Sequence, residues 1–210
     1  MKKTLLLSTL LLSLTACQSA QTQASDKNVI SQPIPSTPSK ADDTNIGSRD
    51  SYNQTIRYKD FSAHVVSTPD GKGGYRLKVQ PMGGRMIEKA IDAPVVKAIV
   101  GDLNGDGFSE ILIFTQSVGS GSYGDVIAYS SNRGLSWSEV FYPELSDKLK
   151  QGYMGHDEFE LVDNKLVRRF PIYLKHDTNA NPKGKMRQIQ YYMRDGGASR
   201  RFVVDKVSEF

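Results

Sequence analysis

Short apolar runs separated by Gly, Asp, Asn and Pro recur along the chain from about residue 51 onward. Many of them alternate apolar and polar residues, which is the period of a strand with one buried face. Only residues 144–151 have a helical pattern, and it is weak. The pattern predicts an all-β fold, an antiparallel sandwich or barrel of about eight strands with at most one short helix. The expected strands lie at residues 61–66, 75–79, 95–100, 110–114, 125–129, 159–162, 165–170, 188–192 and 202–204.

Residues 1–16 have the layout of an export signal. Lys2 and Lys3 precede a leucine-rich run that is too short to span a bilayer as a helix. The run ends in Leu14-Thr15-Ala16-Cys17, which resembles the lipobox of bacterial lipoproteins. That resemblance implies cleavage before Cys17 and lipidation of its thiol. Cys17 is the only cysteine, and exported free thiols are unusual, so we favour lipidation over a plain secretory signal.

The mature chain is expected to consist of a tether and one domain. Residues 17–50 are rich in Gln, Ser, Thr, Asn and Pro, a composition typical of a disordered tether, and 51–210 are enough for one domain. Loss of Lys2 and Lys3 lowers the formal charge from +4 to +2. A nearly neutral chain without a basic block is a poor partner for nucleic acid. Gln18 after the lipidated cysteine implies, by the same resemblance, a periplasmic protein anchored in the outer membrane.

The stretch Gly119–Gly124 matches the dinucleotide-binding pattern G-x-G-x-x-G. That pattern requires a following helix, whereas residues 125–129 alternate as a strand, so a nucleotide site is not expected. A flexible Gly/Ser hairpin loop is the plainest interpretation. Tyr123, however, is a rigid amphipathic group of the kind that anchors protein interfaces.

Oxygen-bearing side chains at alternate positions precede the run 110–114. Asp102, Asn104, Asp106 and Glu110, with glycines between them, resemble a short Ca²⁺-binding loop. The same residues also suit a tight turn between strands. The sequence leaves both interpretations open. If a Ca²⁺ ion binds here, we expect it to have a structural role, and we expect the protein to require no cofactor.

The histidines do not have the close spacing of a zinc site. A Ser120–His156–Asp triad can be drawn, because triads depend on geometry and not on sequence order. Nothing places Ser120 on a nucleophile elbow, so an enzyme is not expected. Histidines on the surface or in loops are the better interpretation.

Four longer stretches resemble the bacterial periplasmic inhibitors of invertebrate-type (i-type) lysozyme. The resemblance extends over roughly residues 95–195, most of the expected domain. The stretches are residues 101–125, 152–161, 166–173 and 177–182.

This resemblance implies an antiparallel β-sandwich that binds a protein and catalyses nothing. Family members insert a Ser-Gly-x-x-Tyr loop, or a close variant, into the catalytic cleft of the lysozyme. In this chain the corresponding loop is Ser120-Gly121-Ser122-Tyr123, with Ser120 and Tyr123 as the functional pair. The expected partner is an i-type lysozyme, and the family suggests a homodimer. The main alternative is a calcium-stabilised adhesion or scaffold module of the cell envelope, which leaves Ser120 and Tyr123 without a role.

Overall fold

The computed structural model describes residues 51–196 and 199–210. The signal peptide, Cys17 and the tether expected in residues 1–50 lie outside this range. None of the described helices is long and apolar enough to cross a membrane. The elements are β1 (Tyr52–Tyr58), β2 (Phe61–Pro69), β3 (Tyr75–Pro81), β4 (Ile87–Ile91), β5 (Val95–Gly101), β6 (Glu110–Gln116), β7 (Gly124–Ser131), β8 (Trp137–Val140), α1 (Asp147–Lys150), β9 (Glu158–Val162), β10 (Lys165–Pro171), β11 (Met186–Arg194) and β12 (Arg201–Glu209).

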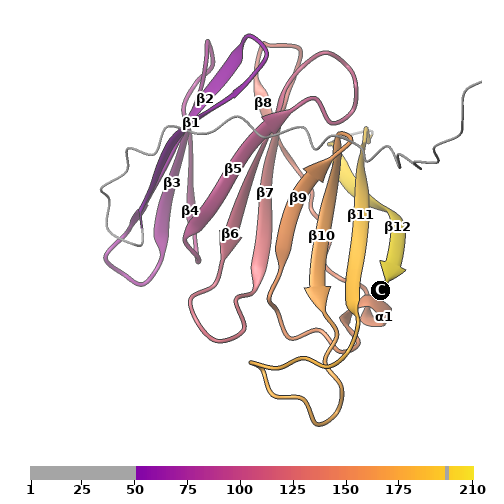
Figure 1. Ribbon diagram of the computed structural model, residues 1–210. Helices are drawn as coiled ribbons and strands as arrows, with labels where there is room; N and C mark the ends of the chain where they lie inside the picture. The colour runs from indigo at the N-terminus through magenta and orange to yellow at the C-terminus, as the bar shows by residue number, and fades with distance from the viewer. Residues whose placement is uncertain (1–50, 197–198) are drawn as a thin grey trace, which may run out of the picture. The chain divides into compact units, whose positions relative to one another are not determined.

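The strands form three antiparallel sheets of four strands each, in which neighbours in sequence are also neighbours in space (Figure 1). The orders are β1-β2-β3-β4, β5-β6-β7-β8 and β12-β11-β10-β9. The predicted all-β antiparallel fold with one short helix is therefore confirmed. The expected number of strands is too low, since residues 51–196 and 199–210 form 12 strands in three sheets, whereas a sandwich has two sheets. The strands missing from the prediction are β1, β4 and β8.

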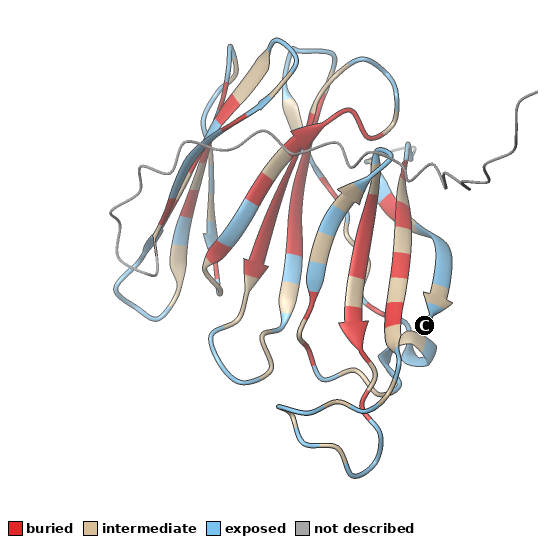
Figure 2. Cartoon of the chain, in the orientation of Figure 1, coloured by how far each residue is buried: buried red, intermediate tan, exposed pale blue. Residues whose placement is uncertain are grey.

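Within the sheet β5–β8, the central strands β6 and β7 are buried on both faces along most of their length, as their red segments in Figure 2 show. Ile111 and Ile113 of β6 belong to a core shared with β1–β4. Leu112 and Phe114 point to the opposite face and join the core shared with β9–β12. Successive strand residues alternate between faces, so an uninterrupted apolar run is what a strand between two cores requires.

The hairpin loops lie at two opposite ends of the sheets. The β6–β7 loop and the β10–β11 loop lie at one end, at the bottom of Figure 1. The β3–β4 and β7–β8 turns lie at the other end. The outer faces of the two flanking sheets carry polar side chains, with ion pairs such as Lys78–Glu88 and Arg169–Glu160. The loops are therefore the parts of the described chain best suited to recognition.

Candidate functional site

The β6–β7 loop, residues 117–123, has a backbone closed by its own hydrogen bonds. The Ser117 N–H donates to the Tyr123 carbonyl at 2.8 Å, and the Tyr123 N–H donates to the Ser117 hydroxyl at 2.9 Å. Gly119 has φ +142°, and Ser122 has φ +43°, a left-handed conformation uncommon for a serine. The loop thus holds one shape while Ser120 and Tyr123 remain exposed to solvent. We call residues 117–123 the presenting loop.

Two segments distant in sequence bind the backbone of the presenting loop. The main-chain N–H of His156 donates to the Gly121 carbonyl at 2.6 Å. The side-chain amide of Asn179 donates to the Ser120 carbonyl. These contacts come from the segment before β9 and from the β10–β11 loop, so three loops meet at this end of the molecule. These contacts fix the main-chain carbonyl groups of Ser120 and Gly121.

Tyr123 lies against a second tyrosine and remains half exposed. Its ring meets that of Tyr153 edge-on, with centroids 5.7 Å apart and planes at 77°, and 49% of the residue is open to solvent. A Cβ added to Gly121 would lie 2.4 Å from the Tyr123 ring. At Gly124 an added Cβ would lie 2.6 Å from the ring of Phe159. Glycine at position 124 therefore allows the loop to approach its support closely, and glycine at position 121 leaves room for the Tyr123 ring within the loop.

A buried ion pair lies beneath the presenting loop. The Arg168 Nε donates to Asp157 Oδ1 at 2.7 Å, and the two side chains are 6% and 0% exposed. The other carboxylate oxygen of Asp157 accepts the Gly124 N–H at 2.8 Å and the Tyr153 hydroxyl. Arg168 also donates to the Tyr153 hydroxyl at 2.8 Å. A buried charged pair persists only with its remaining hydrogen bonds satisfied, and here Gly124 and Tyr153 supply them.

The surroundings shift the protonation equilibria of this cluster. Burial opposes the positive charge of Arg168, but Tyr142 and Asp157 more than offset it, so the pKa of the guanidinium is raised. Burial, and then the hydrogen bond to Asp157, raise the pKa of Tyr153 above that of a free phenol. Arg168 and Tyr153 therefore keep their protons at neutral pH.

The β10–β11 loop is ordered by its own contacts. Asp177 Oδ2 accepts the N–H groups of Leu174 and Lys183, both at 2.8 Å, and these bonds lower the pKa of Asp177. The Tyr173 hydroxyl donates to the Asn179 carbonyl at 2.8 Å. These hydrogen bonds of Asp177 and Tyr173 hold the part of the loop from which the Asn179 side chain contacts the presenting loop.

The structure brings His156 next to Ser120 in the fold, but not as a triad. The His156 ring lies 3.4 Å from Asn179 Oδ1 and 6.2 Å, centroid to centroid, from the Tyr173 ring. Asp157 is bound to Arg168 and does not orient the histidine. Among the described residues, no hydrogen bond joins Ser120 to His156.

The calcium-like loop uses its side-chain oxygens on the backbone. Asp102 accepts the N–H groups of Gly105 at 2.8 Å and Gly107 at 3.1 Å. Asn104 and Asp106 make similar turn bonds, and the two side chains are joined at 2.9 Å. Glu110 is fully buried and accepts the Leu103 N–H at 2.8 Å and the Ser130 hydroxyl at 2.7 Å. Over residues 51–196 and 199–210 no group of three or more His, Cys, Asp or Glu side chains could hold a metal ion.

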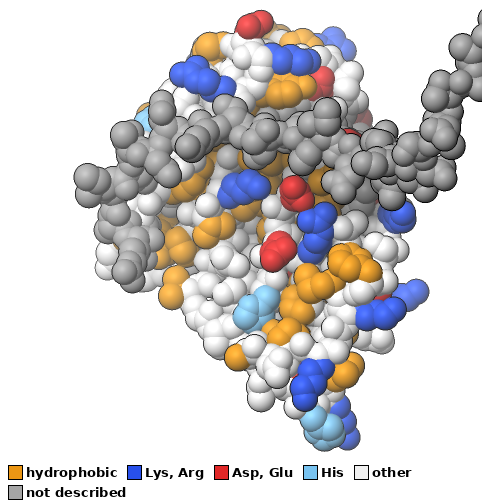
Figure 3. All heavy atoms as spheres, viewed as in Figure 1, with side chains coloured by type: hydrophobic (Ala, Val, Ile, Leu, Met, Phe, Trp, Pro, Cys, Tyr) orange, Lys and Arg blue, Asp and Glu red, His pale blue; other side chains and the backbone are white. Residues whose placement is uncertain are grey.

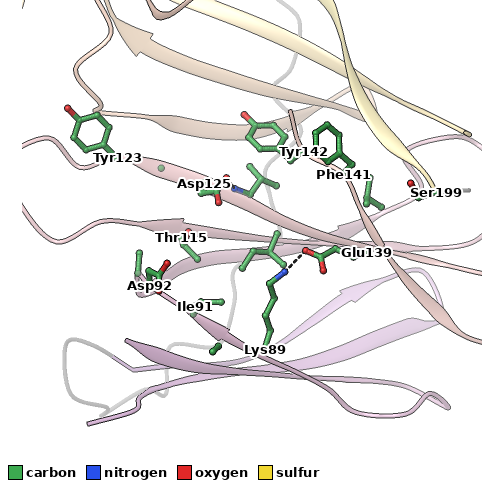
Figure 4. A pocket seen from close by; sticks show the side chains of 16 residues that line it. Lys89, Ile91, Asp92, Thr115, Tyr123, Asp125, Glu139, Phe141, Tyr142 and Ser199 are labelled. Carbon is green, nitrogen blue, oxygen red and sulfur yellow. Dashed lines mark hydrogen bonds and ion pairs between the residues drawn. The ribbon is translucent and has the colours of Figure 1, made fainter. Parts of the chain in front are cut away.

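A groove of about 600 Å³ lies beside the presenting loop, between β4 and the edge of β7 (Figure 4). β8 pairs only with Ala128–Ser131, so among the described strands none pairs with the first half of β7 on that side. Lys89 and Glu139 form an ion pair across the groove. Asp125 and Phe141 are exposed in its lining, together with Tyr123. The groove extends the surface that a partner bound at Tyr123 could contact.

Comparison of the chain with protein-family models, with characterised proteins and with solved structures found no match. The site therefore rests on its own geometry and on the resemblance described above. The sequence predicts Ser120, Gly121, Ser122 and Tyr123 as site residues, and the structure places all four of them in the presenting loop at one end of the molecule. Sequence reasoning gave no role to Tyr153, Asp157, Arg168 and Asn179, which support that loop. All four lie within the stretches that carry the resemblance, and glycines at positions 152 and 155 flank Tyr153.

Proposed function

We propose that this chain inhibits i-type lysozyme by inserting the presenting loop into the catalytic cleft of the enzyme. The observation that carries the proposal is the contrast within the loop. Its backbone is held at Ser120 and Gly121 by Asn179 and His156, whereas the side chains of Ser120 and Tyr123 are free to contact a partner. A loop that is already ordered loses little conformational entropy on binding, so its contacts contribute fully to affinity.

The chemistry of the two side chains suits a glycosidase cleft. Such clefts hold a pair of carboxyl groups, one acting as acid and the other as base or nucleophile. The hydroxyls of Ser120 and Tyr123 can donate hydrogen bonds to ionised carboxyl groups, and neither offers a bond that the enzyme could cleave. Asn179 and the groove that contains Asp125 flank the loop and extend the contact surface.

We further propose that the protein works at the bacterial envelope, held by a lipid on Cys17 as the lipobox implies. Lipidation would keep the inhibitor close to the peptidoglycan that a lysozyme attacks. Mass spectrometry of the protein purified from membranes tests this directly: a diacylglyceryl thioether on Cys17 is expected. An unmodified cysteine in the exported protein would contradict it.

The inhibition itself is tested by mixing the protein with an i-type lysozyme and following the lysis of peptidoglycan. We expect inhibition, at least tenfold weaker for Tyr123→Ala, since truncation of a central aromatic contact typically costs about 2 kcal/mol or more. Ser120→Ala should also weaken it, because one donor to the cleft is lost. Val96→Ser, a change at an exposed position on β5, serves as the control. Lysis that proceeds unhindered in the presence of folded protein would refute the proposal.

A further inference from the structure

The end of the molecule opposite the presenting loop carries exposed apolar side chains. Met82 and Met86 lie in the β3–β4 turn and Leu135 in the β7–β8 turn, with exposed fractions of 57%, 51% and 90%. Phe61 and Trp137 lie with them, partly buried, their rings 5.4 Å apart. We call these five residues the apolar tip.

The tip is one structure and not a set of scattered side chains. A Cβ added to Gly84 would lie 3.0 Å from Trp137 Nε1, so the β3–β4 turn packs directly on β8. The Met82 N–H donates to the Ser62 carbonyl at 2.8 Å, which joins the same turn to β2. In the β7–β8 turn, the Asn132 N–H donates to the Ser136 carbonyl at 2.7 Å and presents Leu135 outward. Fixed turns that expose large apolar groups indicate a surface meant for contact.

Cations surround the tip. Arg85 and Arg133 are exposed, and no ion pair is formed by either of them within the described part of the chain. Lys59 lies over the ring of Tyr58 at 5.0 Å, and Asp60 is the acidic residue in the same β1–β2 turn. Figure 3 shows apolar and cationic side chains together at this end, with a few acidic side chains among them.

We propose that the apolar tip docks onto an anionic phospholipid surface. Apolar side chains on protruding turns can enter the headgroup region, and flanking cations pair with lipid phosphates. A second copy of the chain fits less well, because a two-fold contact at the tip would bring the unpaired Arg85 and Arg133 of both copies together. Docking does not depend on the role of the presenting loop. Its consequence does rest on the proposed function: the presenting loop would point away from the bilayer, toward an incoming lysozyme.

The geometry of β7 gives that orientation. The strand has eight residues and connects the presenting loop at Gly124 to the tip turn after Ser131. At about 3.3 Å per residue, its seven steps place the two ends roughly 23 Å apart. A lipid on Cys17 would raise the local concentration of the tip at the bilayer without adding a contact.

Trp137 supplies a direct readout, because it is the only tryptophan in the chain. The mature chain, residues 17–210 with Cys17→Ser so that no acyl chain contributes, is mixed with vesicles of 30% phosphatidylglycerol in phosphatidylcholine. We expect a blue shift of Trp137 emission and quenching by brominated acyl chains. Vesicles of phosphatidylcholine alone should bind at least tenfold more weakly, and salt should weaken binding to the anionic vesicles.

Three variants separate the contributions. The triple variant Met82→Ser, Met86→Ser, Leu135→Ser should lose at least tenfold in partitioning, and Arg85→Gln with Arg133→Gln should lose the preference for anionic lipid. Val96→Ser, which changes a residue 52% exposed on β5, should bind as the unsubstituted chain does. Absence of binding, or binding that the triple variant retains, would overturn the proposal. If the unsubstituted chain forms a dimer in lipid-free solution and the triple variant is a monomer, the tip would bind a second copy, and this result would also overturn the proposal.

Lysozyme inhibition measured in solution on the same preparations keeps the two proposals apart. The tip variants should inhibit as the unsubstituted chain does, since the tip lies at the far end of β7 from the presenting loop. Vesicle binding without any inhibition would refute the proposed function and leave the docking surface standing. Inhibition without vesicle binding would refute the docking proposal and leave the proposed function intact.

Discussion

The main-chain N–H of His156 donates to the carbonyl oxygen of Gly121 at 2.6 Å, joining the presenting loop to the segment before β9. This contact is made possible by the residue beside it. Gly155 has φ +89°, and a Cβ there would lie 1.9 Å from the same carbonyl oxygen. The two backbones therefore approach so closely that only glycine can stand at position 155.

Gly155→Ala should displace the presenting loop. The added methyl group must push the Gly121 carbonyl away, and alanine is strained at that φ, so we expect a loss of about 2 kcal/mol or more in the free energy of unfolding. Lysozyme inhibition should weaken at least tenfold. Gly71→Ala is the matched control, because Gly71 has φ +75° and open space around it. It should cost about 1 kcal/mol and leave inhibition intact. Undiminished inhibition by folded Gly155→Ala would show that the loop position is unimportant.

Asn179→Ala should loosen the presenting loop without unfolding the domain. The variant removes the hydrogen bond from the side-chain amide to the Ser120 carbonyl, which is worth about 1 kcal/mol. Inhibition should weaken by roughly three- to tenfold, mainly through faster dissociation of the complex, while the melting temperature changes little. Asn181→Ala, in the same β10–β11 loop, should leave both quantities unchanged. Equal effects of the two variants on dissociation would contradict the role given to Asn179.

The strand pattern could be predicted wherever one face of a strand is buried and the other is exposed. Residues 75–79 and 188–192 alternate in this way and became β3 and β11. β1 was not predicted because Tyr52 and Ile56 are its only buried residues. β8 was not predicted because it has only four residues. The third sheet was not foreseen, although Leu112 and Phe114 are as apolar as Ile111 and Ile113. That unbroken run of β6 indicates burial on both faces.

The presenting loop was predictable because its residues are consecutive, whereas its support is assembled by the fold. Asn179 lies 59 positions from Ser120 and binds a main-chain carbonyl, a contact that imposes no pattern on the Ser120 side chain. Asp157 and Arg168 are charged and would be expected on the surface from their residue types alone. They are buried because each supplies the opposite charge that the other needs.

Asp157→Asn should destabilise the domain strongly. The substitution leaves the buried Arg168 without a counter-charge and weakens the acceptor of the Gly124 N–H, so we expect a loss of about 3 kcal/mol in the free energy of unfolding. Chemical denaturation measures this. The double variant Asp157→Asn, Arg168→Met should recover part of the loss, since no unpaired charge remains. Additive losses from the two substitutions would show that the ion pair contributes nothing beyond its separate contacts.

Glu110 should make the stability of the domain fall as the pH rises. Burial raises the pKa of this carboxyl from 4.5 to about 7, further raised by the charges of Asp106 and Asp102 and only partly offset by Ser130 and Leu103. Between these two pH values the folded chain binds a proton that the unfolded chain has lost. The free energy of unfolding therefore decreases across this window, by about 3 kcal/mol in all, and stays low above it.

Glu110→Gln should remove that pH dependence, because a neutral amide has no proton to lose. Denaturation in EDTA at about pH 5 and pH 8 measures it, with the exposed Glu88→Gln as control, which should keep the original slope. A Glu110→Gln variant whose stability still falls as steeply would show that another group is responsible. The same pair also tests calcium binding in this loop. Stabilisation of the unsubstituted chain by added Ca²⁺ at pH 8, absent in Glu110→Gln, would mean that Glu110 leaves its backbone and hydroxyl partners to bind the ion.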